Sequence, residues 1–188
     1  EIALGLARLG ASVLLLCRGL AEGERVRQFV LAAQPRADMS VVVCDLADAT
    51  SIRRAAARLL GEWRRLDVLV HNAGATCPQR TMTTNGIEAT LAIDVVGPFL
   101  LTSLLRGRLE RCHARVITLT GVYQRKGRVD TDDLHFARRA YDWLAANNQA
   151  QRGRWLWMAE LARRAPALMT AAVHPGAVGR PRREVGDR

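Results

Sequence analysis

Short apolar runs alternate with longer segments of helical composition along the chain. The runs lack the i, i+4 spacing of a helix and are typical of strands buried on both faces. They span residues 12–17, 40–44, 66–71, 115–120 and 168–173. The segments expected to be helical span residues 20–34, 49–64, 84–111 and 140–164. This alternation predicts an α/β fold, an open and doubly wound parallel sheet with right-handed crossovers.

Two of the expected helices carry further detail. In 49–64, four apolar residues recur on one side while the arginines point outward. These four are Ile52, Ala55, Leu59 and Trp63. In 84–111, Pro98 removes a backbone donor, so we expect the helix to bend near Gly97.

Length and composition predict one domain over 1–178, followed by a polar, frayed tail at 179–188. No apolar run approaches the roughly 20 residues that a membrane span needs, and no charged and then apolar leader opens the sequence, so we expect no span. The four cysteines are scattered, without the paired spacing of a metal site. This predicts buried thiols in the cytoplasm or another reducing compartment, and no bound metal.

The chain is strongly basic, with a formal net charge of +10, and only Lys126 among its 28 basic residues is a lysine. Such an excess can attract nucleic acid or another polyanion. The arginines, however, are dispersed as singles and pairs, and aromatic residues make up only 5% of the chain. This distribution favours solvated helical faces over a nucleic-acid partner.

The residues that follow the predicted strands form a candidate cofactor site, because ligands of open α/β sheets bind at the carboxyl ends of the strands. Arg18 follows the first run. An acidic residue there would bond an adenosine ribose, whereas a guanidinium would pair with a 2′-phosphate, which favours NADP. Asp45 and Leu46 follow the second run. Asp45 either accepts a hydrogen bond from an adenine amino group or caps the next helix, and both alternatives stay open.

Two turns complete this candidate site. Asn72, Ala73 and Gly74 follow the third run, and their compact turn allows the backbone to approach a cofactor ribose. Pro175 and Gly176 follow the fifth run. We expect that second turn to lie against a nicotinamide.

Several motifs in this order and spacing resemble those of the short-chain dehydrogenase/reductase family. They are CDLAD at 44–48, HNAG at 71–74, IDVVGPFLLT at 93–102, RVITLT at 115–120, ELARR at 160–164 and HPGAV at 174–178. The resemblance covers nearly the whole chain and implies a Rossmann-type fold. Within the family, the stretch VITLTGVYQRKGRVDTDDL looks most like the branch that includes dehydrogenase/reductase member 12, with the retinol dehydrogenases and their relatives next.

The resemblance implies an NADP-dependent oxidoreductase that moves hydride between nicotinamide and a small-molecule carbonyl or alcohol. Such enzymes use a tyrosine as general acid/base, a lysine four residues later, a serine and an asparagine. Counted back from ELARR, the tyrosine position is Asn147 and the lysine position is Gln151. The serine position is Gly121 and the asparagine position is Asp94. All four functional positions are therefore changed, and neither amide can replace an acid/base or a cation.

Other residues are candidates for the missing roles. Thr120 could offer a hydroxyl in place of the serine. Tyr141, and Tyr123 with Lys126, are expected to be structural. Arg152 and Arg154 neighbour the lost lysine, but adjacent helical positions are rotated by roughly 100°, so both should point elsewhere.

The resemblance also predicts what the ends of this chain hold. The sequence begins at the helix that follows the family's glycine-rich phosphate loop, so we expect the first strand and its loop, and the C-terminal strand, to be lacking. Arg180 stands where the family has a threonine that contacts the cofactor. The absent first strand falls in mid-sheet: either the two halves keep their places around an unfilled slot with two unpaired apolar edges, or 12–17 moves over to pair with 66–71. The slot is favoured.

Two function classes follow. The first is an oxidoreductase by descent, in a truncated or divergent form that is inactive. The second is a non-catalytic relative that binds a nucleotide or a protein partner through the same scaffold. A homo-oligomer is compatible with either.

Overall fold

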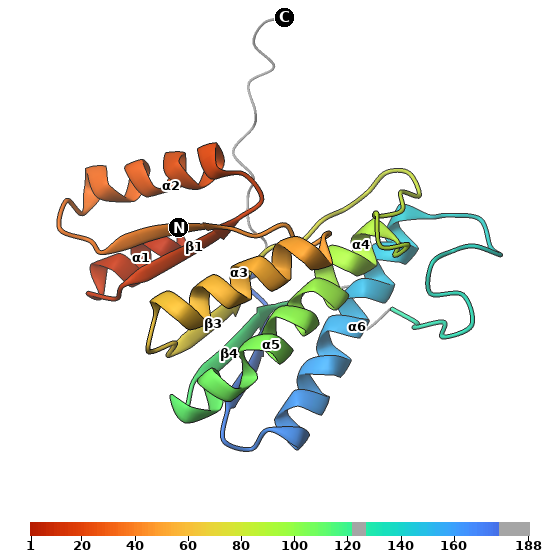
Figure 1. Ribbon diagram of the computed structural model, residues 1–188. Coiled ribbons are helices and arrows are strands. Elements are labelled where there is room, and N and C mark those ends of the chain that lie inside the picture. Colours follow the sequence, from red (N-terminus) through yellow and green to blue (C-terminus); the bar gives the residue numbers. More distant parts are fainter. Residues whose placement is uncertain (122–126, 177–188) are drawn as a thin grey trace, which may run out of the picture.

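The computed structural model describes residues 1–121 and 127–176, in which strands and helices alternate as the apolar pattern predicts (Figure 1). The strands are β1 (Val13–Cys17), β2 (Met39–Val43), β3 (Val68–His71), β4 (Arg115–Leu119) and β5 (Met169–Val173). The helices are α1 (Ile2–Arg8), α2 (Leu20–Ala33), α3 (Ala49–Glu62), α4 (Ala89–Leu91), the π-helix η1 (Ala92–Val96), α5 (Gly97–Arg111) and α6 (Trp143–Arg164). Each predicted strand is present, with bounds shifted by no more than two residues. The expected frayed tail, 179–188, lies outside the described residues.

The five strands form two parallel sheets. β1 pairs with β2, with Val13 opposite Met39, and the second sheet has the order β3-β4-β5. Across the described residues no ladder joins β1 to β3. The alternative in which 12–17 moves over to pair with 66–71 is therefore wrong, and the expectation of two separate halves is confirmed.

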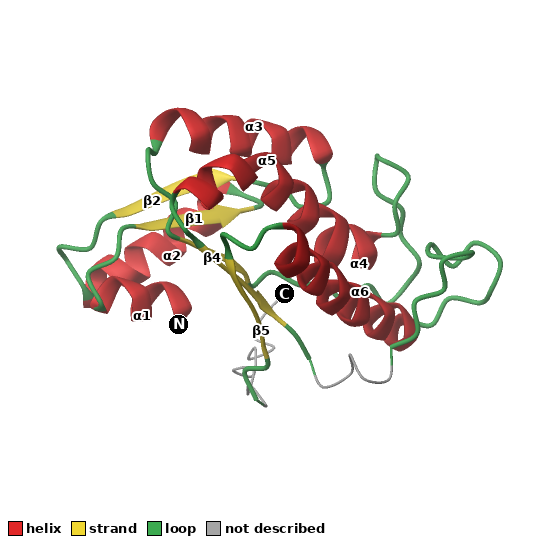
Figure 2. Cartoon of the chain, turned by 90° about the horizontal axis from the view of Figure 1, so that it is seen from below, coloured by secondary structure: helices red, strands yellow, loops and turns green. Residues whose placement is uncertain are grey.

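Burial of β1 on both faces explains why its sequence is apolar throughout. Val13 and Leu15 pack in the cluster formed with α1 and α2, whereas Leu14 and Leu16 pack against the larger cluster beneath α3 and α5. Figure 2 shows α1 and α2 on one side of the strands and α3 and α5 on the other. Successive side chains of a strand point to opposite faces, so each face receives an apolar residue.

The larger core lies between α3, α5, α6 and the strands. The predicted apolar face of α3 is confirmed, because Ile52, Ala55 and Leu59 are each 2% exposed or less. Trp63 follows the helix as its C-cap and is partly buried against the same core. From α5, Leu105 and Leu109 enter this core.

The predicted helix 84–111 starts later than expected and deforms in a different way. It runs from Ala89, and instead of a simple bend at Gly97 it widens into the π-helix η1 over Ala92–Val96. Pro98 lacks the N–H that would bond the carbonyl four residues earlier, and the Gly97 N–H reaches back to the Ala92 carbonyl. A side chain at Gly97 would also collide with the Leu46 carbonyl oxygen, so glycine is required where α5 crosses the turn after β2.

The helical segment Ala89–Arg111 is long and apolar enough to cross a membrane. This helix holds no unbroken apolar run of that length, and the expectation of no membrane span stays a prediction. More than half of its most apolar part is buried inside the protein, and a core helix has the same composition.

All four cysteines are free: Cys44 is buried and the other three are half-buried. Burial raises the pKa of the Cys44 thiol to about 11, with the nearby Asp45 carboxylate acting in the same direction.

Candidate functional site

Three of the four positions expected to be catalytic meet in one place. Gly121, which follows β4, donates its N–H to Gln151 Oε1 at 3.1 Å. Gln151, on α6, donates from Nε2 to Asp94 Oδ2 of η1 at 3.3 Å. Asn147 lies one helical turn before Gln151 and is half-buried. The spacing of the motifs thus locates a real convergence of β4, η1 and α6.

The helix α6 presents these residues because its start is well defined. Asp142 is its N-cap and accepts a hydrogen bond from the Ala145 N–H at 2.7 Å, so the helix begins at Trp143 instead of residue 140. At the other end Arg163 and Arg164 lie in the last turn, where cations complement the helix dipole.

Arg154 is the centre of this site. Its guanidinium donates to the Asp94 carbonyl at 3.0 Å from Nε, to the Leu119 carbonyl at 2.7 Å from Nη1, and to the Ala73 carbonyl at 2.7 Å from Nη2. Nη2 also lies 3.3 Å from Asp94 Oδ1, in an ion pair whose two side chains are 2% and 1% exposed. One side chain therefore connects the turn after β3, η1 and the end of β4.

The expectation that Arg154 points away from the lost lysine position is wrong. Arg154 lies three residues after Gln151, and residues three apart share a helix face. Arg152, one residue after Gln151, does point elsewhere, with its guanidinium 4.9 Å from the centre of the Trp155 ring. The spacing of three was the signal that would have found Arg154.

The electrostatics of the pair are dominated by loss of water. Burial raises the pKa of Asp94 to about 6, although the Arg154 charge and the hydrogen bond from the Ala75 N–H at 2.9 Å both oppose this. Burial likewise lowers the pKa of Arg154, against the pull of Asp94. Both directions indicate that desolvation outweighs mutual attraction, as is common for buried ion pairs. Asp94 is fully buried, so this carboxyl is not placed to exchange protons with a substrate.

Asp45 does not cap α3. The N-cap is Asp48, which accepts from the Thr50 N–H at 2.8 Å, whereas Asp45 Oδ1 accepts from the Ala47 N–H at 2.9 Å in the preceding turn. The capping alternative for Asp45 is therefore wrong. A contact of Asp45 with adenine stays a prediction. The place of Leu46 in the cofactor site also stays a prediction, and this residue is half-buried.

The other residues predicted to face the cofactor are exposed at the carboxyl ends of strands. They are Arg18 after β1, Asn72, Ala73 and Gly74 after β3, and Pro175 and Gly176 after β5. Gly176 has φ +81°, in the left-handed region that favours glycine, and its N–H bonds His174 Nδ1 at 2.9 Å. Their proposed contacts with a cofactor stay predictions.

The hydroxyls considered as replacements are engaged in structural contacts. Thr120 is 5% exposed, and its hydroxyl lies 3.5 Å from the Val173 carbonyl of β5. The Tyr141 hydroxyl bonds the Cys77 carbonyl at 3.0 Å and Glu88 Oε1 at 3.2 Å. Tyr123, Lys126 and Arg180 lie outside the described residues. Among the residues described, no group of three or more His, Cys, Asp or Glu side chains could hold a metal ion.

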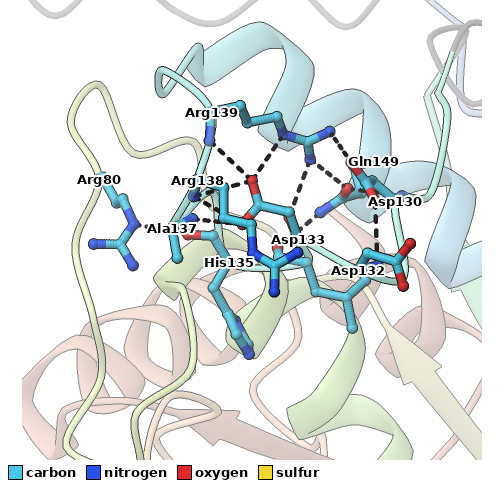
Figure 3. Close-up of polar contacts among 10 residues, drawn as sticks. Arg80, Asp130, Asp132, Asp133, His135, Ala137, Arg138, Arg139 and Gln149 are labelled. Atoms are coloured by element: carbon cyan, nitrogen blue, oxygen red, sulfur yellow. Dashed lines mark hydrogen bonds and ion pairs between the residues drawn. The ribbon is translucent and has the colours of Figure 1, made fainter.

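The segment that leads into α6 is tied to the helix by a polar network (Figure 3). The Asp133 carboxylate accepts the backbone N–H groups of Ala137 at 2.6 Å and of Arg139 at 3.1 Å. Arg139 in turn reaches Asp130 at 3.0 Å and Gln149 Oε1 at 2.9 Å (Figure 3). Gln149 lies between Asn147 and Gln151, so this network fixes the segment beside the candidate site.

The comparisons with known proteins point to one family. A family model described as Enoyl-(Acyl carrier protein) reductase matches residues 1–144. Retinol dehydrogenase 12 of Bos taurus is 36% identical over 181 residues, which are 95% of this chain and 57% of that protein. Retinol dehydrogenase 13 of Homo sapiens is 34% identical, over 94% of this chain and 54% of its own length. The chain thus spans little more than half the length of these curated relatives.

Solved structures show the same fold. A metagenomic short-chain oxidoreductase in complex with NADP has a TM-score of 0.74 at 23% identity, covering 95% of this chain and 76% of its own. An alcohol dehydrogenase from the archaeon Thermococcus sibiricus, complexed with 5-hydroxy-NADP, has a TM-score of 0.75 at 18% identity, covering 96% and 75%. The fold, the order of the motifs and the similarity to the retinol dehydrogenases agree: the chain belongs to the short-chain dehydrogenase/reductase family, in its retinol dehydrogenase-like branch.

Proposed function

We propose that this chain is an NADP-binding oxidoreductase scaffold by descent whose carbonyl-reducing centre is inactive. The observation that carries the proposal is the pair Asn147 and Gln151, at the tyrosine and lysine positions that the resemblance implies. A carboxamide has no proton to exchange near neutral pH and no charge to stabilise a phenolate. The Gln151 amide is, moreover, already bonded on both sides, by the Gly121 N–H and to the Asp94 carboxylate.

The chain should accordingly show no NADPH oxidation with generic aldehydes and ketones beyond that of a heat-killed control. Loss of a positioned acid/base alone removes about 10²–10⁴-fold in rate. The measurement is the absorbance of NADPH over time, with the purified protein at high concentration. Turnover well above the heat-killed control would contradict the proposal.

Asn147→Tyr combined with Gln151→Lys tests whether the centre is merely degraded. Asn147→Phe with the same lysine is the matched control, because it has the same ring and lacks the hydroxyl. Activity in the tyrosine variant and none in the phenylalanine variant would indicate an enzyme that lost its relay. No activity in either folded variant would favour the second candidate, a non-catalytic relative that binds a nucleotide or a protein partner. The buried Arg154–Asp94 pair supports this second candidate, because it fills the space beside Gln151 with a paired and dehydrated arginine.

The proposed cofactor is NADP. Arg18 is exposed directly after β1, where a guanidinium would meet a 2′-phosphate, and the two solved relatives above were determined with NADP or 5-hydroxy-NADP.

Arg18→Ala should lower the affinity for NADPH while leaving that for NADH nearly unchanged. A charge-assisted pair with the phosphate contributes on the order of 1.5–3 kcal/mol, which is roughly a 10- to 100-fold change in dissociation constant. Calorimetric titration of both nucleotides measures it. Arg25→Ala, which removes another exposed arginine on α2, is the control. Equal loss for both nucleotides, or an unaltered preference, would remove the role of Arg18.

We further propose that any substrate of the whole protein is a small-molecule carbonyl or alcohol, because the relatives named above are retinol and alcohol dehydrogenases. Four free cysteines support a location in the cytoplasm or another reducing compartment.

Nucleic acid is not proposed as a partner. If the folded protein were retained on DNA or RNA, and this retention fell steeply as the salt concentration rose, nucleic acid would have to be considered as a partner.

A further inference from the structure

Arg154 spans segments that are far apart in the sequence. Its three carbonyl acceptors, on Ala73, Asp94 and Leu119, belong to the turn after β3, to η1 and to the end of β4. These three bonds have good lengths, between 2.7 and 3.0 Å. A lysine could not make them together, because its ammonium is a single point at the end of a flexible stem.

The main-chain acceptor on Asp94 is free because of Pro98. In an α-helix the carbonyl of residue 94 would accept from the N–H of residue 98, which proline lacks. Arg154 Nε takes that place at 3.0 Å. The carboxylate of Asp94 is used as well, by the Ala75 N–H at 2.9 Å and by Arg154. Asp94 and Arg154 therefore hold the turn 72–75 from both sides, through the carbonyl of Ala73 and the N–H of Ala75.

The two charges are also dependent on each other. Both side chains are nearly dehydrated, at 1% and 2% exposed, so either would be an uncompensated buried charge without its partner. Breaking a buried pair by removing one partner is far more costly than removing both.

We propose that Asp94 and Arg154 act as one positioning unit: the pair holds the turn 72–75 against η1 and β4, and each residue is tolerated there only with the other. The effect on nucleotide binding rests on the proposed function, since that turn is expected to face the cofactor ribose. The mutual dependence of the two residues does not rest on the proposed function.

A double-mutant cycle tests the dependence. The variants are Asp94→Asn, Arg154→Met and the two combined, with Arg58→Met and Glu62→Gln as the matched cycle on an exposed ion pair of α3. We expect each buried single change to lower the melting temperature by roughly 6–15 °C and the combined change to lower it by clearly less than the sum. The exposed changes should each cost less than about 2 °C. Additive losses in the buried cycle, or single changes as mild as the exposed ones, would overturn the proposal.

Acid provides a readout that lost packing alone would not move. Without Arg154 the attraction that holds the pKa of Asp94 down is gone, so the carboxyl becomes neutral more readily as the pH falls. The difference in melting temperature between the parent and Arg154→Met should therefore narrow from pH 8 to pH 5. The difference between Asp94→Asn and the double variant should not narrow, because neither of these proteins has the Asp94 carboxyl. Two other titratable groups face this pair. Glu88 is the same in all four proteins, but the Arg154 charge also lowers the pKa of His71, so all four proteins carry His71→Asn in this comparison. A gap that is constant with pH would count against the charge dependence.

If the other buried variants do not fold, Arg154→Lys tests whether charge compensation causes the mutual dependence. It keeps the charge and loses the planar fork, so it should fold and melt below the parent. Failure of Arg154→Lys to fold as well would show that charge compensation is not the cause.

The effect on the turn is measured by NADPH titration of the double variant. We expect at least a tenfold weaker affinity than in the parent, because the Ala73 carbonyl is released. Equal affinity would overturn the positioning role. If the parent itself binds no NADPH, the proposed function fails, and the melting cycle still decides on the pair.

Discussion

Leu105→Ala is expected to lower the free energy of unfolding by about 2–5 kcal/mol. Leu105 is 1% exposed in the middle of α5, within the core that joins α5 to α3 and to the strands. The loss combines the removed apolar contact with the cavity left behind, since packed helices relax only partly. Urea unfolding followed by circular dichroism measures it, as a lower midpoint at an unchanged slope.

Leu9→Ala is the matched control, with the same change of side chain at a residue that is 84% exposed. It should alter the free energy of unfolding by no more than about 0.5 kcal/mol. A loss below 1 kcal/mol at Leu105 would show that α5 does not pack as described. A change of slope would point to the partial separation of the two sheets, because β1 and β3 are not paired.

β1 was predictable because both of its faces pack against apolar clusters. Apolar residues therefore fill every position from Val13 to Cys17, and no alternation is needed. The start of α3 was predictable as well, though the identity of its cap was not. Asp45 and Asp48 both precede the helix, and the chain reaches helical geometry one residue after Asp48, which leaves Asp45 to close the turn before it.

The candidate site was only partly predictable. Motif spacing located Asp94, Gly121 and Gln151, and Gln151 is hydrogen-bonded to both of the others in the structure. It did not locate Arg154, because helical neighbours point about 100° apart and the shared face appears only at the spacing of three from Gln151. The π-helix was not predicted either. In the sequence, Pro98 indicates only that the Asp94 carbonyl lacks its helical donor. The structure is needed to show that the Arg154 guanidinium of α6 donates to this carbonyl.

Acid should weaken the fold through His71, the last residue of β3. The imidazole is 5% exposed, its Nε2 is hydrogen-bonded to Thr102 Oγ1 at 2.8 Å, and its ring meets Trp157 edge-on. Burial lowers the pKa of His71 to about 3, and the charge of Arg154 acts in the same direction. The folded state thus favours the neutral ring, so this stability is full above the unfolded pKa of about 6.5 and is lost as the pH falls toward 3. Between pH 7 and pH 5 the loss from His71 alone is about 2 kcal/mol.

His71→Asn isolates this contribution, because asparagine stays neutral at every pH. Asp94 acts in the opposite sense: its raised pKa makes the folded state bind a proton first, and offsets about 1 kcal/mol of the loss over the same range. Asp94 is present in both proteins, so the difference between them reports His71. Urea unfolding at pH 7 and pH 5 should show the parent losing about 2 kcal/mol relative to His71→Asn. His174 is exposed, so His174→Asn is the control and should lose as much unfolding free energy as the parent between pH 7 and pH 5. If His71→Asn also lost as much as the parent, the His71 ring would gain its proton without cost in the folded protein.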